Sequence, residues 1–305
     1  MDRRKFVMNT AALGMSLGLP SVSAHNLSEE ISNKQGLNIK KSLKYGMIKA
    51  GNTVLDKFKL VKEIGFDGVE LDSPNGLDAK EILDAKEKTG LVIPGVVNSY
   101  HWKYPLSHPD TAVREKCLES CKQALRDCKL YGGDTVLIVP GVVNAETSYE
   151  EAWIRSQVEI RKLIPVAEET GVKIAFENVW NNFILSPLEA ARYVDDFNHP
   201  LVGWYFDIGN IVRYGWPEHW IQTLNRRIMK LDVKEYSRVK QREEGVWKGF
   251  KVELLEGDCN WPVVINALDK IGYSGWASAE VSGGDEVRLR TIYEKMDEIF
   301  NIIPE

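Results

Sequence analysis

The sequence predicts a single (β/α)8 TIM barrel, in which eight parallel strands close into a barrel inside a ring of outer helices. From residue 43 to residue 289, short β-branched runs alternate with longer amphipathic segments. This alternation is typical of parallel βαβ units, and eight units are the number that a TIM barrel needs. The units follow one another too closely to leave room for a second domain.

Each unit has a recognisable strand and a recognisable helix end. The predicted strands span 44–48, 68–72, 92–98, 135–140, 173–178, 202–208, 228–234 and 275–281. Helix ends are marked by glycines in IGFDG, KTGL, YGGD, ETGV and IGYSG. Glycine is favoured there because it adopts the left-handed conformation of a helix C-cap. A doubly wound open sheet is the main alternative, but no GxGxxG or GxxxxGK loop follows the first predicted strand, which argues against a nucleotide-binding fold.

The composition is that of a soluble globular protein. Of 305 residues, 44% are hydrophobic and 27% are charged, which excludes disordered and collagen-like classes. The 39 basic and 44 acidic residues give a net charge of −5. We therefore expect no nucleic-acid partner.

The N-terminus resembles a cleavable export signal. Arg3, Arg4 and Lys5 precede an apolar stretch at 6–19, and small residues at 22–24 suit a cleavage site. The arginine pair is similar to a twin-arginine signal, so we expect export, to the periplasm. The apolar stretch is too short to span a bilayer core of about 30 Å, so no stable membrane anchor is expected after cleavage. The predicted organisation is a signal at 1–24, a polar linker at 25–42 and the barrel at 43–305.

The four cysteines are predicted to be buried thiols. Cys117, Cys121 and Cys128 fall on one helical pattern, and Cys259 stands alone. No cluster of His or Cys follows that would complete a metal site with Cys117 and Cys121.

Four acidic residues end four consecutive predicted strands. They are Glu177 in IAFENVW, Asp207 in WYFDIGN, Asp232 in IMKLDVKEY and Glu280 in WASAEV. Any one of them could cap a helix or pair with a lysine. Together they replace apolar residues at the mouth of the barrel, where active sites of this fold lie and where four carboxylates would repel one another without a cation. Oxygen ligands without cysteine favour Mn²⁺ or Mg²⁺ ahead of Zn²⁺.

Several longer runs resemble a known family. These runs are GFDGVEL, GGDTVLIVPG, FENVWNNFILSP, WYFDIGN and LEGDCNWP. They are similar to the sugar phosphate isomerases/epimerases of the xylose-isomerase-like TIM barrel superfamily, over roughly residues 43 to 302. The resemblance implies one divalent ion, usually Mn²⁺ with Mg²⁺, Co²⁺ or Zn²⁺ as alternatives, held by Glu, Asp, His and Glu. Glu177, Asp207 and Glu280 match three of these ligands, and Asp232 stands where the family has histidine.

The resemblance extends to residues around the metal. Arg238 matches an arginine that clamps the substrate, and Asn210 stands where the family tends to have a histidine. From the residues alone, His101, Trp102 and Trp180 are candidates for contacts with a sugar ring, although a surface loop or a helix cap would also explain them. Glu70, at the end of the second strand, either positions substrate or pairs with a basic residue inside the barrel.

The predicted activity is that of a metal-dependent isomerase or epimerase, which removes a proton next to the carbonyl of a keto sugar. The resemblance implies that Glu177 and Glu280 are the acid/base pair. Export, and the acids Asp285 and Glu286 where a phosphate would bind, favour a non-phosphorylated sugar or glycoside as the partner. Two alternatives stay open: a 3-keto-glycoside lyase or hydrolase that eliminates the aglycone, and a non-catalytic sugar-binding barrel. A homo-oligomer is also left open.

Overall fold

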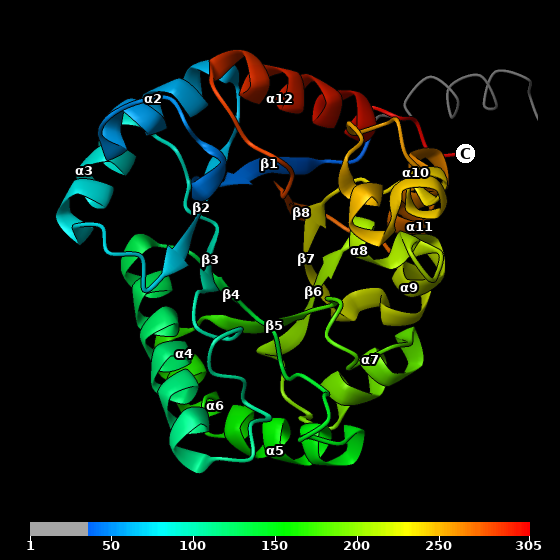
Figure 1. The fold of residues 1–305 in the computed structure, drawn as a ribbon. Helices are drawn as coiled ribbons and strands as arrows, with labels where there is room; N and C mark the ends of the chain where they lie inside the picture. The colour runs from blue at the N-terminus through cyan, green and yellow to red at the C-terminus, as the bar shows by residue number, and fades with distance from the viewer. Residues whose placement is uncertain (1–35) are drawn as a thin grey trace, which may run out of the picture. The chain divides into compact units, whose positions relative to one another are not determined.

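The computed structural model describes residues 36–305, which form one compact unit. The predicted export signal at 1–24 and most of the predicted linker lie outside the described residues. Eight parallel strands pair in the order β1 to β8, and β8 pairs with β1, so the sheet is a closed barrel. Helices surround this barrel (Figure 1). The predicted TIM barrel is confirmed.

The strand bounds agree with the predicted ranges for seven of the eight strands to within a few residues. The strands are β1 Ile39–Lys44, β2 Gly68–Ser73, β3 Gly95–Asn98, β4 Thr135–Ile138, β5 Lys173–Glu177, β6 Val202–Asp207, β7 Ile228–Val233 and β8 Gly275–Ala279. The α-helices are α2 Val54–Ile64, α3 Ala79–Thr89, α4 Thr111–Tyr131, α5 Tyr149–Arg161, α6 Ile164–Thr170, α7 Pro187–Asp195, α8 Ile208–Val212, α9 Pro217–Leu224, α10 Arg238–Glu244, α11 Trp261–Lys270 and α12 Glu286–Phe300. Three short 3-10 helices are η1 Tyr45–Met47, η2 Asn225–Arg227 and η3 Val246–Phe250.

The first strand was predicted at the wrong place. It spans Ile39–Lys44 instead of 44–48, so the barrel begins inside the segment expected to be linker. Its sequence IKKSLK has three lysines and little β-branched character, which hides it from pattern analysis. Lys41 pairs with Asp297, and Lys44 points into the barrel. Ion pairs with residues far along the chain therefore compensate the positive charges of this strand.

Local signals explain most helix ends. Ser148 and Ser186 form capping boxes at the starts of α5 and α7. Gly90 and Gly171 adopt the left-handed conformation at the ends of α3 and α6, as predicted. These signals therefore fix where the helices between the strands begin and end.

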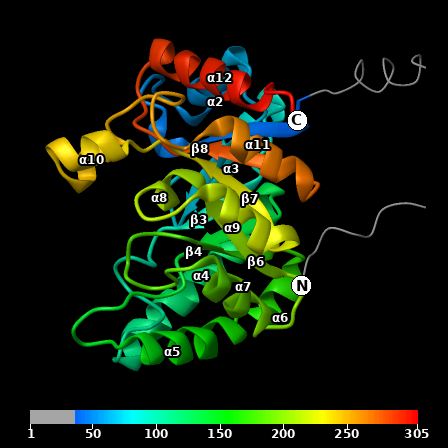
Figure 2. The same ribbon diagram turned by 90° about the vertical axis from the view of Figure 1, so that its right-hand side faces the viewer.

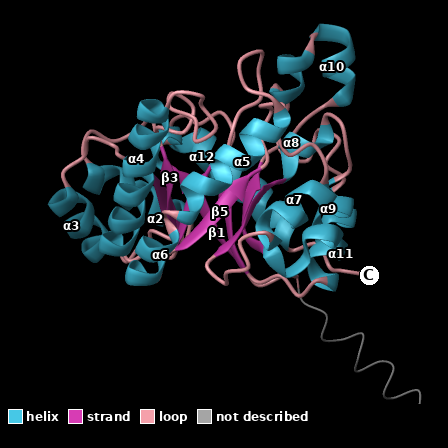
Figure 3. Cartoon of the chain, turned by 90° about the horizontal axis from the view of Figure 1, so that it is seen from below, coloured by secondary structure: helices cyan, strands magenta, loops and turns pink. Residues whose placement is uncertain are grey.

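Most apolar side chains pack between the strands and the outer helices, whereas the barrel interior is largely polar near its mouth. A small inner apolar layer contains Leu137, Ala175 and Tyr205. All four cysteines are buried free thiols, as predicted. No helix among residues 36–305 is long and apolar enough to cross a membrane. Figures 2 and 3 show that α10 projects away from the ring of helices, beyond the end of the barrel.

Candidate functional site

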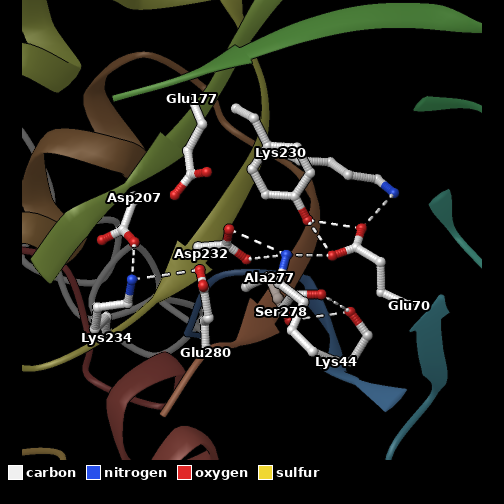
Figure 4. Close-up of polar contacts among 12 residues, drawn as sticks. Lys44, Glu70, Glu177, Asp207, Lys230, Asp232, Lys234, Ala277, Ser278 and Glu280 are labelled. Carbon is white, nitrogen blue, oxygen red and sulfur yellow. Dashed lines mark hydrogen bonds and ion pairs between the residues drawn. The ribbon is translucent and has the colours of Figure 1, made fainter. Parts of the chain in front are cut away.

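Strand register brings the four predicted acids to one place. Asp207 in β6 lies directly opposite Asp232 in β7, and Asp232 lies opposite Ser278 in β8. Alternate residues of a strand share a face. An acid two positions after a residue that points into the barrel therefore points into the barrel as well. Glu177 ends β5, and Glu280 directly follows β8. Figure 4 shows the four carboxyl groups converging from four strands.

The carboxyl groups are spaced as ligands of one cation would be. One oxygen from each of Glu177, Asp207, Asp232 and Glu280 can be chosen so that all four lie within 4.8 Å of one another. Hard divalent ions hold carboxylate oxygens at about 2.0–2.6 Å, so opposite ligands lie about twice that distance apart. Buried oxygens of Asp207, Asp232 and Glu280 also accept no hydrogen bond of acceptable geometry. The residues present therefore fit a divalent ion.

Two lysines approach the same oxygens. The Lys234 ammonium lies 2.7 Å from Asp207 Oδ2 and 3.4 Å from Glu280 Oε2. The Lys44 ammonium lies 2.8 Å from Asp232 Oδ1. Four carboxylates and two ammonium groups leave two net negative charges, which one divalent ion would neutralise. The charge of the cluster thus agrees with its geometry.

Burial sets the protonation behaviour of this cluster. It raises the pKa of Glu177 well above the usual value, and the neighbouring Glu280 charge adds to this. Burial also raises the pKa of Asp232 strongly, because it outweighs the opposing effect of Lys44. At Glu280 the attraction of Lys234 and Lys44 overcomes burial and lowers the pKa. In the absence of a cation, protons therefore compensate part of the negative charge.

A second ionic group lies deeper in the barrel, centred on Glu70. Lys44 reaches Glu70 as well as Asp232, and the Lys230 ammonium lies 3.7 Å from Glu70 Oε1. The Tyr205 hydroxyl donates to Glu70 at 2.8 Å. Figure 4 shows Lys44 between Asp232 and Glu70. Of the two roles considered for Glu70, the structure therefore places it in a buried ion pair beneath the site.

Asp207 and Asn210 organise one side of the cluster. Asp207 Oδ1 accepts the Asn210 backbone N–H at 2.8 Å, so this acid caps α8 with one oxygen and offers the other to the cluster. The Asn210 amide donates to Asn178 O at 3.0 Å and lies 3.4 Å from Glu177 Oε1. Its Oδ1 accepts from Lys234 at 3.3 Å. Asn210 therefore holds a ligand and a lysine in fixed positions.

A cavity of about 620 Å³ opens directly above the cluster. Glu177, Glu280, Asn210 and Lys234 form part of its lining. The other lining residues are Trp102, Val179, Trp180, Glu235, Trp247, Phe250, Lys251, Val252, Glu253, Val281, Ser282 and Arg288. This volume is typical of small-molecule sites.

Two predicted contact residues do not line this cavity. The Arg238 guanidinium donates to Val212 O at 2.9 Å and to Gly215 O at 2.6 Å, so it is bound to the end of α8 and the loop that follows. His101 is buried, and its Nδ1 accepts the Val139 N–H at 3.3 Å. Burial lowers the pKa of His101 to about 3, so its imidazole is neutral.

Sequence reasoning missed Lys44, Trp247 and Phe250. Lys44 was missed because its strand was misplaced. Trp247 and Phe250 lie in η3, which belongs to the excursion between β7 and α11. The only signal was their aromatic character in the run GVWKGF, which does not indicate on its own that the excursion folds back over the barrel mouth.

Comparisons with known proteins agree with this architecture. The family model described as xylose isomerase-like TIM barrel matches residues 58–298. The L-ribulose-5-phosphate 3-epimerase UlaE of Salmonella typhi is 26% identical over 238 residues, which cover 74% of this chain and 81% of that protein.

Solved structures show the same fold. The 3-keto-D-glucoside 4-epimerase YcjR from E. coli superposes with a TM-score of 0.72 at 16% identity, covering 86% of this chain and 98% of the other. The D-psicose 3-epimerase of Clostridium cellulolyticum H10 gives 0.69 at 16% identity, covering 88% and 100%. The family model spans most of the chain, and the expected resemblance is confirmed. This chain therefore belongs to the xylose isomerase-like TIM barrel family.

Proposed function

We propose that this protein is a divalent-metal-dependent isomerase or epimerase that moves a proton at the carbon next to the carbonyl of a keto sugar. The observation that carries the proposal is the convergence of four strand-end carboxylates beneath a cavity that two of them, Glu177 and Glu280, also line. The three relatives named above are sugar epimerases by name, which supports this reaction class.

Glu177, Asp207, Asp232 and Glu280 would hold the ion, with Mn²⁺ expected first. When bound, a divalent ion would polarise the substrate carbonyl and lower the cost of removing the neighbouring proton. The protein's own contribution is to place two carboxylates where a substrate above the cluster meets both. A proton can then leave to one carboxylate and return from the other, which is what inversion at carbon requires.

The surroundings of the two glutamates differ. Glu177 is buried, its pKa is raised, and Asn210 lies beside it. Glu280 lies beside Lys234, which favours its ionised form. Both carboxylates line the cavity above the cluster. We therefore infer that Glu177 and Glu280 together form the acid/base pair.

We also propose that the substrate is not phosphorylated. Of the cations that line the cavity, Lys234 is paired with Asp207 and Glu280, and Arg288 is paired with Glu253. Exposed Lys251 remains, but four acids share the lining with these three cations. A doubly charged phosphate would be poorly matched there. A neutral sugar also agrees with the proposed export of the protein. The support for that export is the N-terminal sequence.

The test is solvent exchange. Mn²⁺-loaded protein is incubated in D₂O with a panel of free ketoses, their phosphates and 3-keto-glycosides, and products are followed by NMR. We expect deuterium at one carbon next to the carbonyl, together with the epimer or isomer. Release of the aglycone would instead favour the lyase, and absence of exchange in the whole panel would contradict the proposed function. A higher kcat/KM on the phosphorylated form of a matched pair would contradict the neutral-substrate proposal.

Matched variants sharpen this test. Glu177→Gln and Glu280→Gln should each lower kcat by about 10²-fold or more, because each removes a proton-transfer group. Glu256→Gln is the control, since Glu256 is exposed and pairs with Lys295 on the surface. Metal content is measured in each variant, so that loss of the ion can be separated from loss of proton transfer.

A further inference from the structure

The cavity extends from the carboxylates onto a group of aromatic side chains. Trp180, Trp247 and Phe250 line it together, and we call them the aromatic platform. The rings of Trp180 and Phe250 are stacked with centroids 4.7 Å apart, and those of Trp180 and Trp247 lie 5.0 Å apart. The platform is thus one contiguous apolar surface.

The aromatic platform directly adjoins the candidate metal centre. The Lys234 ammonium lies 5.6 Å from the centroid of the Phe250 ring, and the same ammonium contacts Asp207 and Glu280. A ligand that reaches the carboxylates and continues along the cavity therefore meets Phe250 and then its neighbours.

The platform is held in place before any ligand binds. The Tyr236 hydroxyl donates to Val246 O at 2.8 Å, and its ring packs edge-on against Phe250. Gly249 lies so close to the Tyr236 ring that a Cβ there would be 2.3 Å from a ring carbon. Trp180 Nε1 donates to Asn210 O at 2.8 Å. Such preorganisation lowers the entropic cost of binding.

One member of the platform is unusually exposed. Trp247 is 67% exposed although it lines the cavity, whereas Trp180 is half-buried among Phe250, Trp247 and the Arg213 guanidinium. Trp102, on the β3–α4 connection, also lines the cavity and is 54% exposed. An exposed indole beside a catalytic cavity offers an apolar face to a ring, which is a common use of tryptophan in binding sites.

We propose that the substrate carries a second ring, joined to the keto sugar by a glycosidic bond, and that this ring stacks on Trp247 of the aromatic platform. The proposal rests on the proposed function for the keto sugar over the carboxylates. The shared chemistry of the second ring is an apolar ring face, which either another sugar or an aromatic aglycone presents. Trp247 lines the same cavity as Glu177 and Glu280, and its exposed indole offers a face to that ring.

The first test measures binding without turnover. Isothermal titration of the metal-loaded protein compares D-glucose with phenyl α- and β-D-glucosides, maltose and cellobiose. We expect at least one of the two-ring ligands to bind about fivefold tighter than D-glucose or better, within the range that one aromatic stack supplies. In Trp247→Ala, the affinities for D-glucose and for that two-ring ligand should lie within about twofold of each other. The phenyl glucosides and the disaccharides distinguish an aromatic second ring from a sugar.

The matched control is Trp216→Ala. Trp216 is likewise an exposed tryptophan, at 54%, but it packs against Arg238 and does not line the cavity. This variant should keep the preference for two-ring ligands. Equal affinities for one-ring and two-ring ligands in the unmodified protein, or a preference that survives Trp247→Ala, would overturn the proposal. So would a fall in molecular mass of Trp247→Ala on size-exclusion chromatography with light scattering, because Trp247 would then contact a second copy of the chain.

The second test separates this proposal from the proposed function. Solvent exchange on a free ketose with no effect of Trp247 on two-ring binding would leave the function standing and remove the platform's role. Two-ring binding that depends on Trp247, without exchange on any substrate, would support the platform's role and contradict the proposed function. If both hold, Trp247→Ala should lower kcat/KM for a 3-keto-glycoside more than for the matching free keto sugar, mainly through KM.

Discussion

Lys44 Nζ lies 2.8 Å from Asp232 Oδ1, and the same ammonium is paired with Glu70. Lys44 ends β1 and Asp232 is near the end of β7. The contact therefore joins, from within the barrel, the two strands that flank β8. Burial alone would lower the pKa of Lys44, but Asp232 and Glu70 raise it well above the usual value. Lys44 therefore stays charged and balances Asp232.

The first prediction concerns this balance. Lys44→Met should lower the free energy of unfolding by about 3–5 kcal/mol, because it leaves buried Glu70 and Asp232 without their shared cation. Lys41→Met is the control: Lys41 lies on the same strand, but its partner Asp297 is half exposed, so the loss should stay near about 1 kcal/mol. Both are measured by urea unfolding in EDTA. Asp232→Asn should recover part of the loss in the Lys44→Met background, and strict additivity of the two changes would argue against the coupling.

The second prediction concerns the ligand type. Asp232→His should still bind one divalent ion, and its preference should move from Mn²⁺ towards Zn²⁺, because imidazole is a softer ligand than carboxylate. Competition between the two ions, followed by elemental analysis, measures the change. An unchanged preference would mean that residue 232 does not contact the ion.

The third prediction isolates the charge of Asp207. Asparagine caps helices about as well as aspartate, so Asp207→Asn should keep the cap of α8 and lose only the cluster charge. We expect loss of bound Mn²⁺ with a nearly unchanged melting temperature in EDTA. Asp78→Asn, at the exposed cap of α3, is the matched control and should keep its metal. One equivalent of Mn²⁺ retained by Asp207→Asn would remove Asp207 from the ligand set.

Much of this site was predictable from the sequence, and the rest depended on contacts between distant segments. Glu177, Asp207, Asp232 and Glu280 were found because each interrupts an apolar strand pattern at its end. Lys44 was not found, since a lysine-rich strand becomes acceptable only through partners far along the chain. The aromatic platform was missed for a similar reason: local patterns do not determine where the excursion after β7 folds.

The position of Arg238 illustrates the same limit. The resemblance led us to expect Arg238 at the substrate because of its spacing from residue 232, but spacing along a chain does not fix where a long side chain points. Backbone carbonyls of Val212 and Gly215 are available beside it, and the guanidinium is bound there. The resemblance supplied the residue, and only the packed structure supplied its surroundings.

The fourth prediction is a pH dependence. The folded protein without metal holds Glu177 and Asp232 with raised pKa values, so it binds protons more tightly there than the unfolded chain does. The stability from these groups is therefore present below their unfolded pKa and is lost as the pH rises through the folded pKa. A divalent ion replaces those protons. The rise in melting temperature on adding Mn²⁺ should accordingly be larger at about pH 7.5 than at about pH 5.5, and the opposite trend would contradict the raised pKa values.

The fifth prediction assigns Arg238 to structure. Its guanidinium donates to the carbonyl of Val212 at the end of α8 and to that of Gly215 in the following loop. It packs over Trp216 at 5.1 Å from the ring centroid, and it does not line the cavity. Arg238→Ala should therefore lower the free energy of unfolding by roughly 1–3 kcal/mol, because two part-buried carbonyls lose a charged donor. KM for the substrate identified by solvent exchange should stay within about twofold of the value for the unmodified protein, because the substitution removes no contact with the substrate. Arg238→Lys should recover part of the stability by keeping the charge. A large rise in KM at unchanged stability would instead place the side chain on the substrate, and would mean that the guanidinium leaves the two carbonyls when substrate binds.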